Sequence, residues 1–194
     1  MTEDESIKKV TEDIRSGIDL LRKNGRLDLL KDMFGDELRD IAYNKKAASD
    51  FPMGIAVTDS MHIIIPQMNN IEVKMPTLAR ALYIFYLIHK EGVAYKRLVD
   101  YRQQLYDIYR ITSNRSDKEK LNATINRLVN PLDNKVNECA SRIKDAFTKI
   151  FNDNTAELYY LTSDMEHPAS TYTKTIRLPR ELVSLPDSLL TLTD

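Results

Sequence analysis

The sequence of 194 residues is poor in cysteine, glycine and long apolar stretches, and these shortages exclude several classes of protein. Cys139 is the single cysteine, so no disulfide can form within the chain, and we expect a reducing compartment, the cytoplasm. No apolar run approaches the ~20 residues that a membrane-spanning helix needs, so we expect no membrane partner. The segment from Met1 to Glu5 is acidic and lacks the basic and apolar regions of a secretory signal.

Sequence motifs of catalysis are missing as well. With only five glycines, the chain contains no phosphate-binding P-loop, no glycine-rich dinucleotide loop and no serine-nucleophile motif. His62, His89 and His167 are scattered without the spacing of metal ligands. Cys139 falls in an apolar helical stripe, which favours an inert buried thiol over a nucleophile. We therefore expect a protein that is not an enzyme, with no catalytic residue, no cofactor and no metal.

Charge is nearly balanced over the whole chain but unevenly distributed along it. There are 28 Lys and Arg residues against 29 Asp and Glu residues. Residues 75–151 carry 14 basic and 8 acidic side chains, a balance of +6, whereas residues 1–74 and 152–194 have balances of −3 and −4. The basic middle of the chain is therefore the segment to examine for an anionic partner.

Residues 1–50 are expected to form a helical N-terminal appendage. Apolar residues recur there at spacings of three and four, on one face of a helix: Ile7, Val10, Ile14, Ile18 and Leu21. Asn24-Gly25 is typical of a helix end, and shorter helices are predicted over 27–34 and 36–46. The apolar stripe either packs on its own domain or forms a homodimer through the N-terminal helix. Because it spans only two heptads, the first interpretation is favoured.

Residues 51–180 are predicted to form one α+β domain. Short extended runs at 53–58, 61–65 and 71–75 have the alternation of an antiparallel meander. The runs 157–162 and 172–178 predict a β-hairpin with a long polar tip that contains Asp164 and Glu166. Residues 181–194, which contain Pro186, are expected to be a C-terminal tail.

Amphipathic helices are predicted between the meander and the hairpin. One runs from Thr77 to a C-terminal glycine, Gly92, and another covers residues 98–111. Ser116, with Glu119 three residues later, is the pattern of a capping box and predicts the next helix start. A last helix, capped by Asp133 or Asn134, carries an apolar stripe with spacings of three and four: Val136, Cys139, Ile143, Phe147 and Ile150.

This order of elements resembles the winged-helix DNA-binding effector domain of two-component response regulators. The stretch 78–98, LARALYIFYLIHKEGVAYKRL, resembles that family's first helix, its terminal glycine and its short strand into the second helix. The stretch 136–147, VNECASRIKDAF, resembles the recognition helix, and residues 159–178 resemble the closing wing. The segment 111–131 departs from the family as an enlarged helix, the wing tip has no arginine, and residues 1–50 are not a receiver domain.

The resemblance implies transcription regulation through double-stranded DNA. A basic amphipathic helix enters the major groove in such proteins, where arginine and asparagine read base edges and lysine neutralises phosphate. The candidate residues for DNA binding are Arg127 on one helix and six residues on the next: Lys135, Asn137, Ser141, Arg142, Lys144 and Lys149.

The alternative is a protein–protein interaction module or structural protein built on a winged-helix-like fold. Tyrosine is favoured at protein interfaces, and tyrosines are dense between residues 83 and 109: Tyr83, Tyr86, Tyr95, Tyr101, Tyr106 and Tyr109. A single positive face on residues 75–151 favours nucleic acid, whereas an exposed tyrosine patch favours a protein partner.

Overall fold

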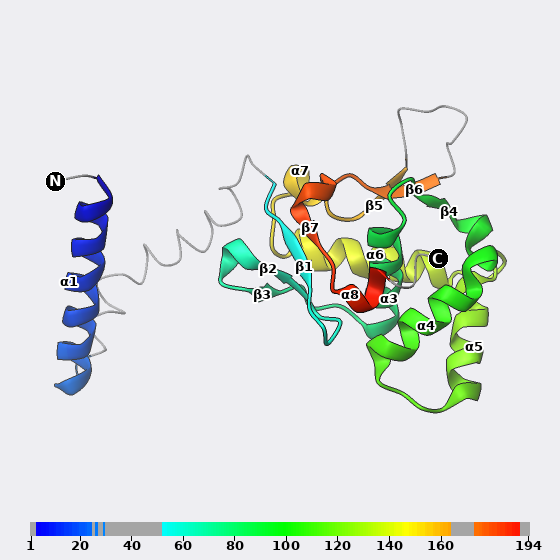
Figure 1. Cartoon of the computed structure of the whole chain (residues 1–194), viewed down its shortest axis with the longest axis horizontal. Coiled ribbons are helices and arrows are strands. Elements are labelled where there is room, and N and C mark those ends of the chain that lie inside the picture. The colour runs from blue at the N-terminus through cyan, green and yellow to red at the C-terminus, as the bar shows by residue number, and fades with distance from the viewer. Residues whose placement is uncertain (1–2, 25, 27–28, 30–51, 164–172, 191–194) are drawn as a thin grey trace. The chain divides into compact units, whose positions relative to one another are not determined.

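The computed structural model describes residues 3–24, 26, 29, 52–163 and 173–190, and it divides into two compact units at residues 45 and 46 (Figure 1). The first unit contains α1 (Glu3–Lys23), so the helix predicted from the N-terminal stripe is confirmed. Val10 and Ile14 on that stripe are 56% and 57% exposed. The helices predicted over 27–34 and 36–46 lie, apart from residue 29, outside the described residues.

The second unit is an α+β structure with two small sheets, as the sequence predicts at that level. In the first sheet, β1 (Ile55–Val57) pairs antiparallel with β2 (Ile63–Ile65), and β2 pairs antiparallel with β3 (Ile71–Glu72). A single 3-10 turn, η1 (Pro66–Met68), connects β2 to β3. The predicted meander is confirmed, although each strand is shorter than its apolar run.

Residues 181–190 belong to the fold of this domain, so they are not the tail that the sequence predicts. The 3-10 turn η4 (Arg180–Leu182) leads into β7 (Val183–Ser184), which pairs parallel with β1, and α8 (Asp187–Leu190) follows. Leu189 is fully buried. A two-residue strand that pairs with a segment more than a hundred residues earlier leaves no local pattern in the sequence.

Helix α3 (Thr77–Ile88) is surrounded by the rest of the domain. Every residue from Ala81 to Leu87 is buried, which is why the helix is apolar all round its circumference. It packs against α4 (Arg102–Ser113) and α6 (Lys135–Thr148). The Arg180 guanidinium donates to the Leu87 carbonyl at 3.0 Å and so joins the end of α3 to the C-terminal segment.

The remaining helices follow the predicted order with different starts. The 3-10 helix η2 (Tyr95–Tyr101) precedes α4, so the helix predicted from residue 98 begins later. Next to α4 lies α5 (Lys118–Val129), whose N-cap is Asp117 rather than the predicted Ser116 (Figure 1). The Asp117 carboxylate accepts from the Lys120 amide at 3.1 Å, and an ionised cap is the stronger acceptor at a helix start. Short α7 (Asp153–Ala156) follows α6.

The second sheet confirms the hairpin and adds a third strand to it. Its order is β4-β6-β5, where β4 is Val93–Ala94, β5 is Leu161–Ser163 and β6 is Thr173–Ile176. Gly92 has a φ of +72°, and a Cβ there would lie 2.5 Å from the Lys174 carbonyl oxygen. A glycine is therefore needed for β4 to approach β6. The predicted hairpin tip, with Asp164 and Glu166, lies outside the described residues.

The burial of Leu189 predicts that the C-terminal segment stabilises the domain. Leu189→Ala removes a fully buried side chain and should cost roughly 2–5 kcal/mol of unfolding free energy. The exposed control Glu181→Ala should stay within about 0.5 kcal/mol of the parent protein. Urea denaturation followed by circular dichroism measures both, and equal stability of the two variants would contradict the packing of α8.

Candidate nucleic-acid interface

Helix α6 carries five of the seven candidate residues, Lys149 is its C-cap, and its start is fixed by Asp133. One Asp133 carboxylate oxygen accepts from the Lys135 amide at 3.0 Å, and the other accepts from Arg127 Nε at 3.0 Å. Asn134 is the N-cap by position, but its side chain does not cap the helix. The Arg127 guanidinium lowers the pKa of Asp133 through that hydrogen bond. The first role of Arg127 is therefore to hold the turn between α5 and α6.

The inner face of α6 is anchored in the core, as the apolar stripe predicts. Val136, Cys139, Ile143 and Phe147 are all buried, whereas Ile150 is only half-buried. The Phe147 ring lies 5.2 Å from the Tyr83 ring of α3 and 5.3 Å from the Tyr159 ring, measured between centroids. These aromatic contacts set the rotation of α6 about its axis, and so they determine which residues face outward.

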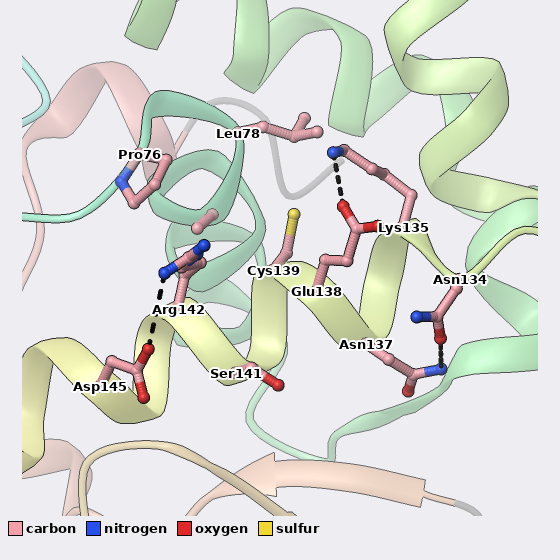
Figure 2. A pocket seen from close by; sticks show the side chains of 11 residues that line it. Pro76, Leu78, Asn134, Lys135, Asn137, Glu138, Cys139, Ser141, Arg142 and Asp145 are labelled. Carbon is pink, nitrogen blue, oxygen red and sulfur yellow. Dashed lines mark hydrogen bonds and ion pairs between the residues drawn. The ribbon is translucent and has the colours of Figure 1, made fainter.

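One outward row of α6 carries no acidic residue. Asn137, Ser141 and Lys144 are spaced by four and three and are all exposed. The Asn137 amide donates to the side-chain oxygen of Asn134 at 2.9 Å, and Lys144 Nζ lies 5.2 Å from the centroid of the Tyr160 ring. Figure 2 shows Asn137 and Ser141 on the side of α6 away from Leu78. This row, which we call the polar row, offers amide, hydroxyl and ammonium groups to a partner.

The neighbouring row of α6 alternates in charge. Lys135 Nζ lies 2.6 Å from a Glu138 carboxylate oxygen, and Arg142 lies 3.8 Å from Asp145 (Figure 2). The hydrogen bond that Lys135 donates to Glu138 raises the pKa of Lys135. Lys149 extends the row at an exposed position. Exposed ion pairs of this kind are worth only about 0–1 kcal/mol, so the cations remain able to exchange their carboxylates for another anion.

A groove of about 530 Å³ lies beside this charged row. Its other wall is the start of α3, with Pro76, Leu78 and Ala79, and Figure 2 shows the Lys135 ammonium beside Leu78. Arg142 and Asp145 line the α6 side. The groove therefore combines an apolar wall with a wall of paired charges.

Sequence reasoning missed two lysines beside α6, Lys174 on β6 and Lys96 on η2. A smaller cavity of about 270 Å³ is lined by Lys96, Lys174, Tyr95 and Asn137, among others. Lys174 Nζ donates to the Ser163 hydroxyl at 2.7 Å and lies 5.7 Å from the centroid of the Tyr95 ring. From the sequence, the charges of the hairpin were considered only at its acidic tip. A lysine inside a strand gives no sign of which helix it approaches, because that depends on the pairing of β4 with β6.

Two of the three histidines, His62 and His89, lie within the described residues, and each contacts a different polar side chain. His62 Nδ1 lies 2.6 Å from a Glu72 carboxylate oxygen, a contact that lowers the pKa of Glu72, and His89 Nε2 lies 2.7 Å from the Gln104 side-chain oxygen. His167 lies outside the described residues. Among the residues that the structure describes, no three His, Cys, Asp or Glu side chains are grouped so as to hold a metal ion.

The environment of Cys139 predicts an unreactive thiol. Burial raises the pKa of Cys139 to about 11, and the charge of Lys135 one turn earlier opposes that rise without cancelling it. At pH 8 about one thiol in a thousand is then ionised. A disulfide reagent such as dithionitrobenzoate should therefore modify the native protein at least tenfold more slowly than the protein unfolded in urea. Equal rates would show that the Cys139 side chain is accessible in the folded protein.

Within the described ranges, no helix is both long and apolar enough to cross a membrane. The chain matches no family model, no curated protein and no solved structure. The chemical interpretation of α6 and its surroundings therefore rests on the geometry of this chain.

Proposed function

We propose that this protein binds double-stranded DNA as a non-enzymatic regulator of transcription, with the outward face of α6 in the major groove. The observation that carries the proposal is the polar row Asn137, Ser141 and Lys144, which is exposed and free of acidic residues. In the neighbouring row, cations alternate with Glu138 and Asp145. An α-helix fits the major groove, and amide and hydroxyl groups on its outer face are suited to base edges and phosphates. The single buried cysteine is in keeping with a place in the cytoplasm.

The chain order of the second unit supports a winged-helix-like domain. The family that the sequence resembles has a first helix, a short strand, a second helix, a recognition helix and a hairpin wing. Here α3, β4, α4, α6 and the β5–β6 hairpin follow in that order, and β4 joins the hairpin in one sheet. Helix α5 stands between the second helix and α6 as an additional element. In this interpretation α6 is the recognition helix.

Each candidate residue has a distinct role in the proposed complex. Arg142 and Asn137 have the planar donor groups that read guanine and adenine, and Ser141 can bond to either a base or a phosphate. Lys144, Lys149 and Lys135 neutralise phosphates. Arg127 acts indirectly, because its bond to Asp133 holds the start of α6. Lys174 and Lys96 extend the positive surface from α6 toward the second sheet.

A protein-interaction module remains the second candidate function, and the groove beside α6 is the observation that favours it. Its apolar wall, with Pro76 and Leu78, is a feature of protein-binding sites rather than of phosphate-binding sites. The tyrosines do not add to this case. Tyr83, Tyr86 and Tyr109 are buried, and the other three pack partly buried against the core. They therefore form no exposed patch of the kind an interface uses.

A homodimer through the N-terminal helix is part of the proposal. Regulators with one recognition helix per chain commonly bind two half-sites as a symmetric dimer. Val10 and Ile14 are exposed on one face of α1, and a contiguous exposed apolar patch is typical of an interaction site.

Binding through phosphates predicts a steep dependence on salt. With about four phosphates neutralised, the logarithm of the binding constant should fall against the logarithm of salt concentration with a slope near −4. Fluorescence anisotropy with a labelled duplex, between about 50 and 200 mM salt, measures the slope. An absence of binding at the lowest salt would refute the proposal and favour the protein-interaction module.

Arg142 should contribute to binding without contributing to folding. Arg142→Ala should weaken duplex binding by about 1–3 kcal/mol if the guanidinium reads a base. Its melting temperature should hardly change, because the side chain is 66% exposed and its contact with Asp145 is long. Arg110→Ala, which removes the same charge from α4, is the matched control and should leave affinity nearly unchanged.

Ile143→Asp tests the opposite face of the same helix. Ile143 is fully buried, so an aspartate there places an unpaired charge in the core and should unfold the domain. Thermal melts recorded beside the binding assay separate the two effects. If Arg142→Ala lowers the melting temperature as much as Ile143→Asp does, then Arg142 is structural and α6 is not the recognition helix.

A further inference from the structure

The spacings between the apolar residues of the α1 stripe are the same counted from either end of the helix. Its residues are at positions 7, 10, 14, 18 and 21, so the spacings are three, four, four and three. Ile14 is the centre of this arrangement. A surface of this kind is complementary to a second copy of itself turned end over end, which is the requirement for a two-fold symmetric contact.

The middle of the stripe is exposed, since Val10 is 56% and Ile14 57% exposed. Ile18 and Leu21 are half-buried. Most of the stability of a helix in a protein comes from packing its apolar face. Gly17 lies in the middle of α1 with no atom within 4 Å of where its Cβ would be, and such a glycine costs about 1 kcal/mol of helix stability. An occupant of the stripe would supply the missing stabilisation.

We infer that α1 pairs antiparallel with α1 of a second copy, about a two-fold axis at Ile14. In this register Ile14 lies opposite the partner's Ile14, and Val10 lies opposite the partner's Ile18. The inference gives the orientation and register of the homodimer included in the proposed function, and it does not depend on DNA binding.

The charges at the two ends of α1 favour the antiparallel orientation. The first turn has three consecutive acidic positions, 3 to 5, whereas basic residues occupy positions 22, 23 and 26 at the other end. Antiparallel pairing brings the acidic end of each helix beside the basic end of the other, and it also opposes the two helix dipoles. Parallel pairing would place like charges together at both ends.

The central position gives the sharpest test of the contact. Ile14→Asp places two carboxylates together on the two-fold axis, and the dimer of the full chain should weaken at least a hundredfold. Ser16→Asp adds the same charge on the far face of α1, where Ser16 is exposed, and should leave association unchanged. Sedimentation velocity over a range of protein concentrations, without DNA, measures all three proteins.

Two results of that experiment overturn the inference. The first is a parent protein that is monomeric at the highest concentration. If the parent protein is monomeric and Ile14→Asp lowers the melting temperature, then the stripe is covered by another part of the same chain. The second is an Ile14→Asp variant that still dimerises like the Ser16→Asp control, because the contact then lies elsewhere. Duplex binding is measured separately, so its failure leaves this result unaffected.

Cross-linking tests the orientation. Val10→Cys and Ile18→Cys variants, mixed under mild oxidation, should form a disulfide between unlike chains at least tenfold faster than between like chains. Cys139 is buried, so it contributes little background. Mass spectrometry identifies the cross-linked chains. Preferential cross-linking of Val10→Cys with itself would establish a parallel pair and overturn the inference.

Discussion

The buried surface of α3 is the constraint on which the second unit depends. Because this helix is apolar on all sides, it is stable only when other elements cover its whole circumference. Helices α4 and α6 cover two parts of it, and Tyr86 also donates its buried hydroxyl to the Val93 carbonyl of β4 at 2.9 Å. One bond thus ties α3 to the sheet that holds the hairpin. The position of Lys174 relative to α6 follows from this arrangement.

The rotation of α6 about its axis separates its core residues from the candidate residues for DNA binding. Phe147 and Ile143 are held in the core, so Asn137, Ser141 and Lys144 must face outward. The contacts of the outward side chains are exposed ones, such as the hydrogen bond of Asn137 to Asn134 and the ion pair of Arg142 with Asp145. The proposed DNA contact therefore requires no change in the packing of the domain. Arg127 is different, because its carboxylate partner Asp133 also caps the helix.

The sequence was informative where a pattern repeats within one element and uninformative where distant segments meet. The spacing of Val136, Cys139 and Ile143 predicted the buried face of α6 correctly. The cap of α5 was misplaced by one residue, because Ser116 and Asp117 both satisfy the preference for an N-cap. The parallel strand β7 and the approach of Lys174 to α6 could not be predicted, since each depends on a pairing between segments far apart in the chain.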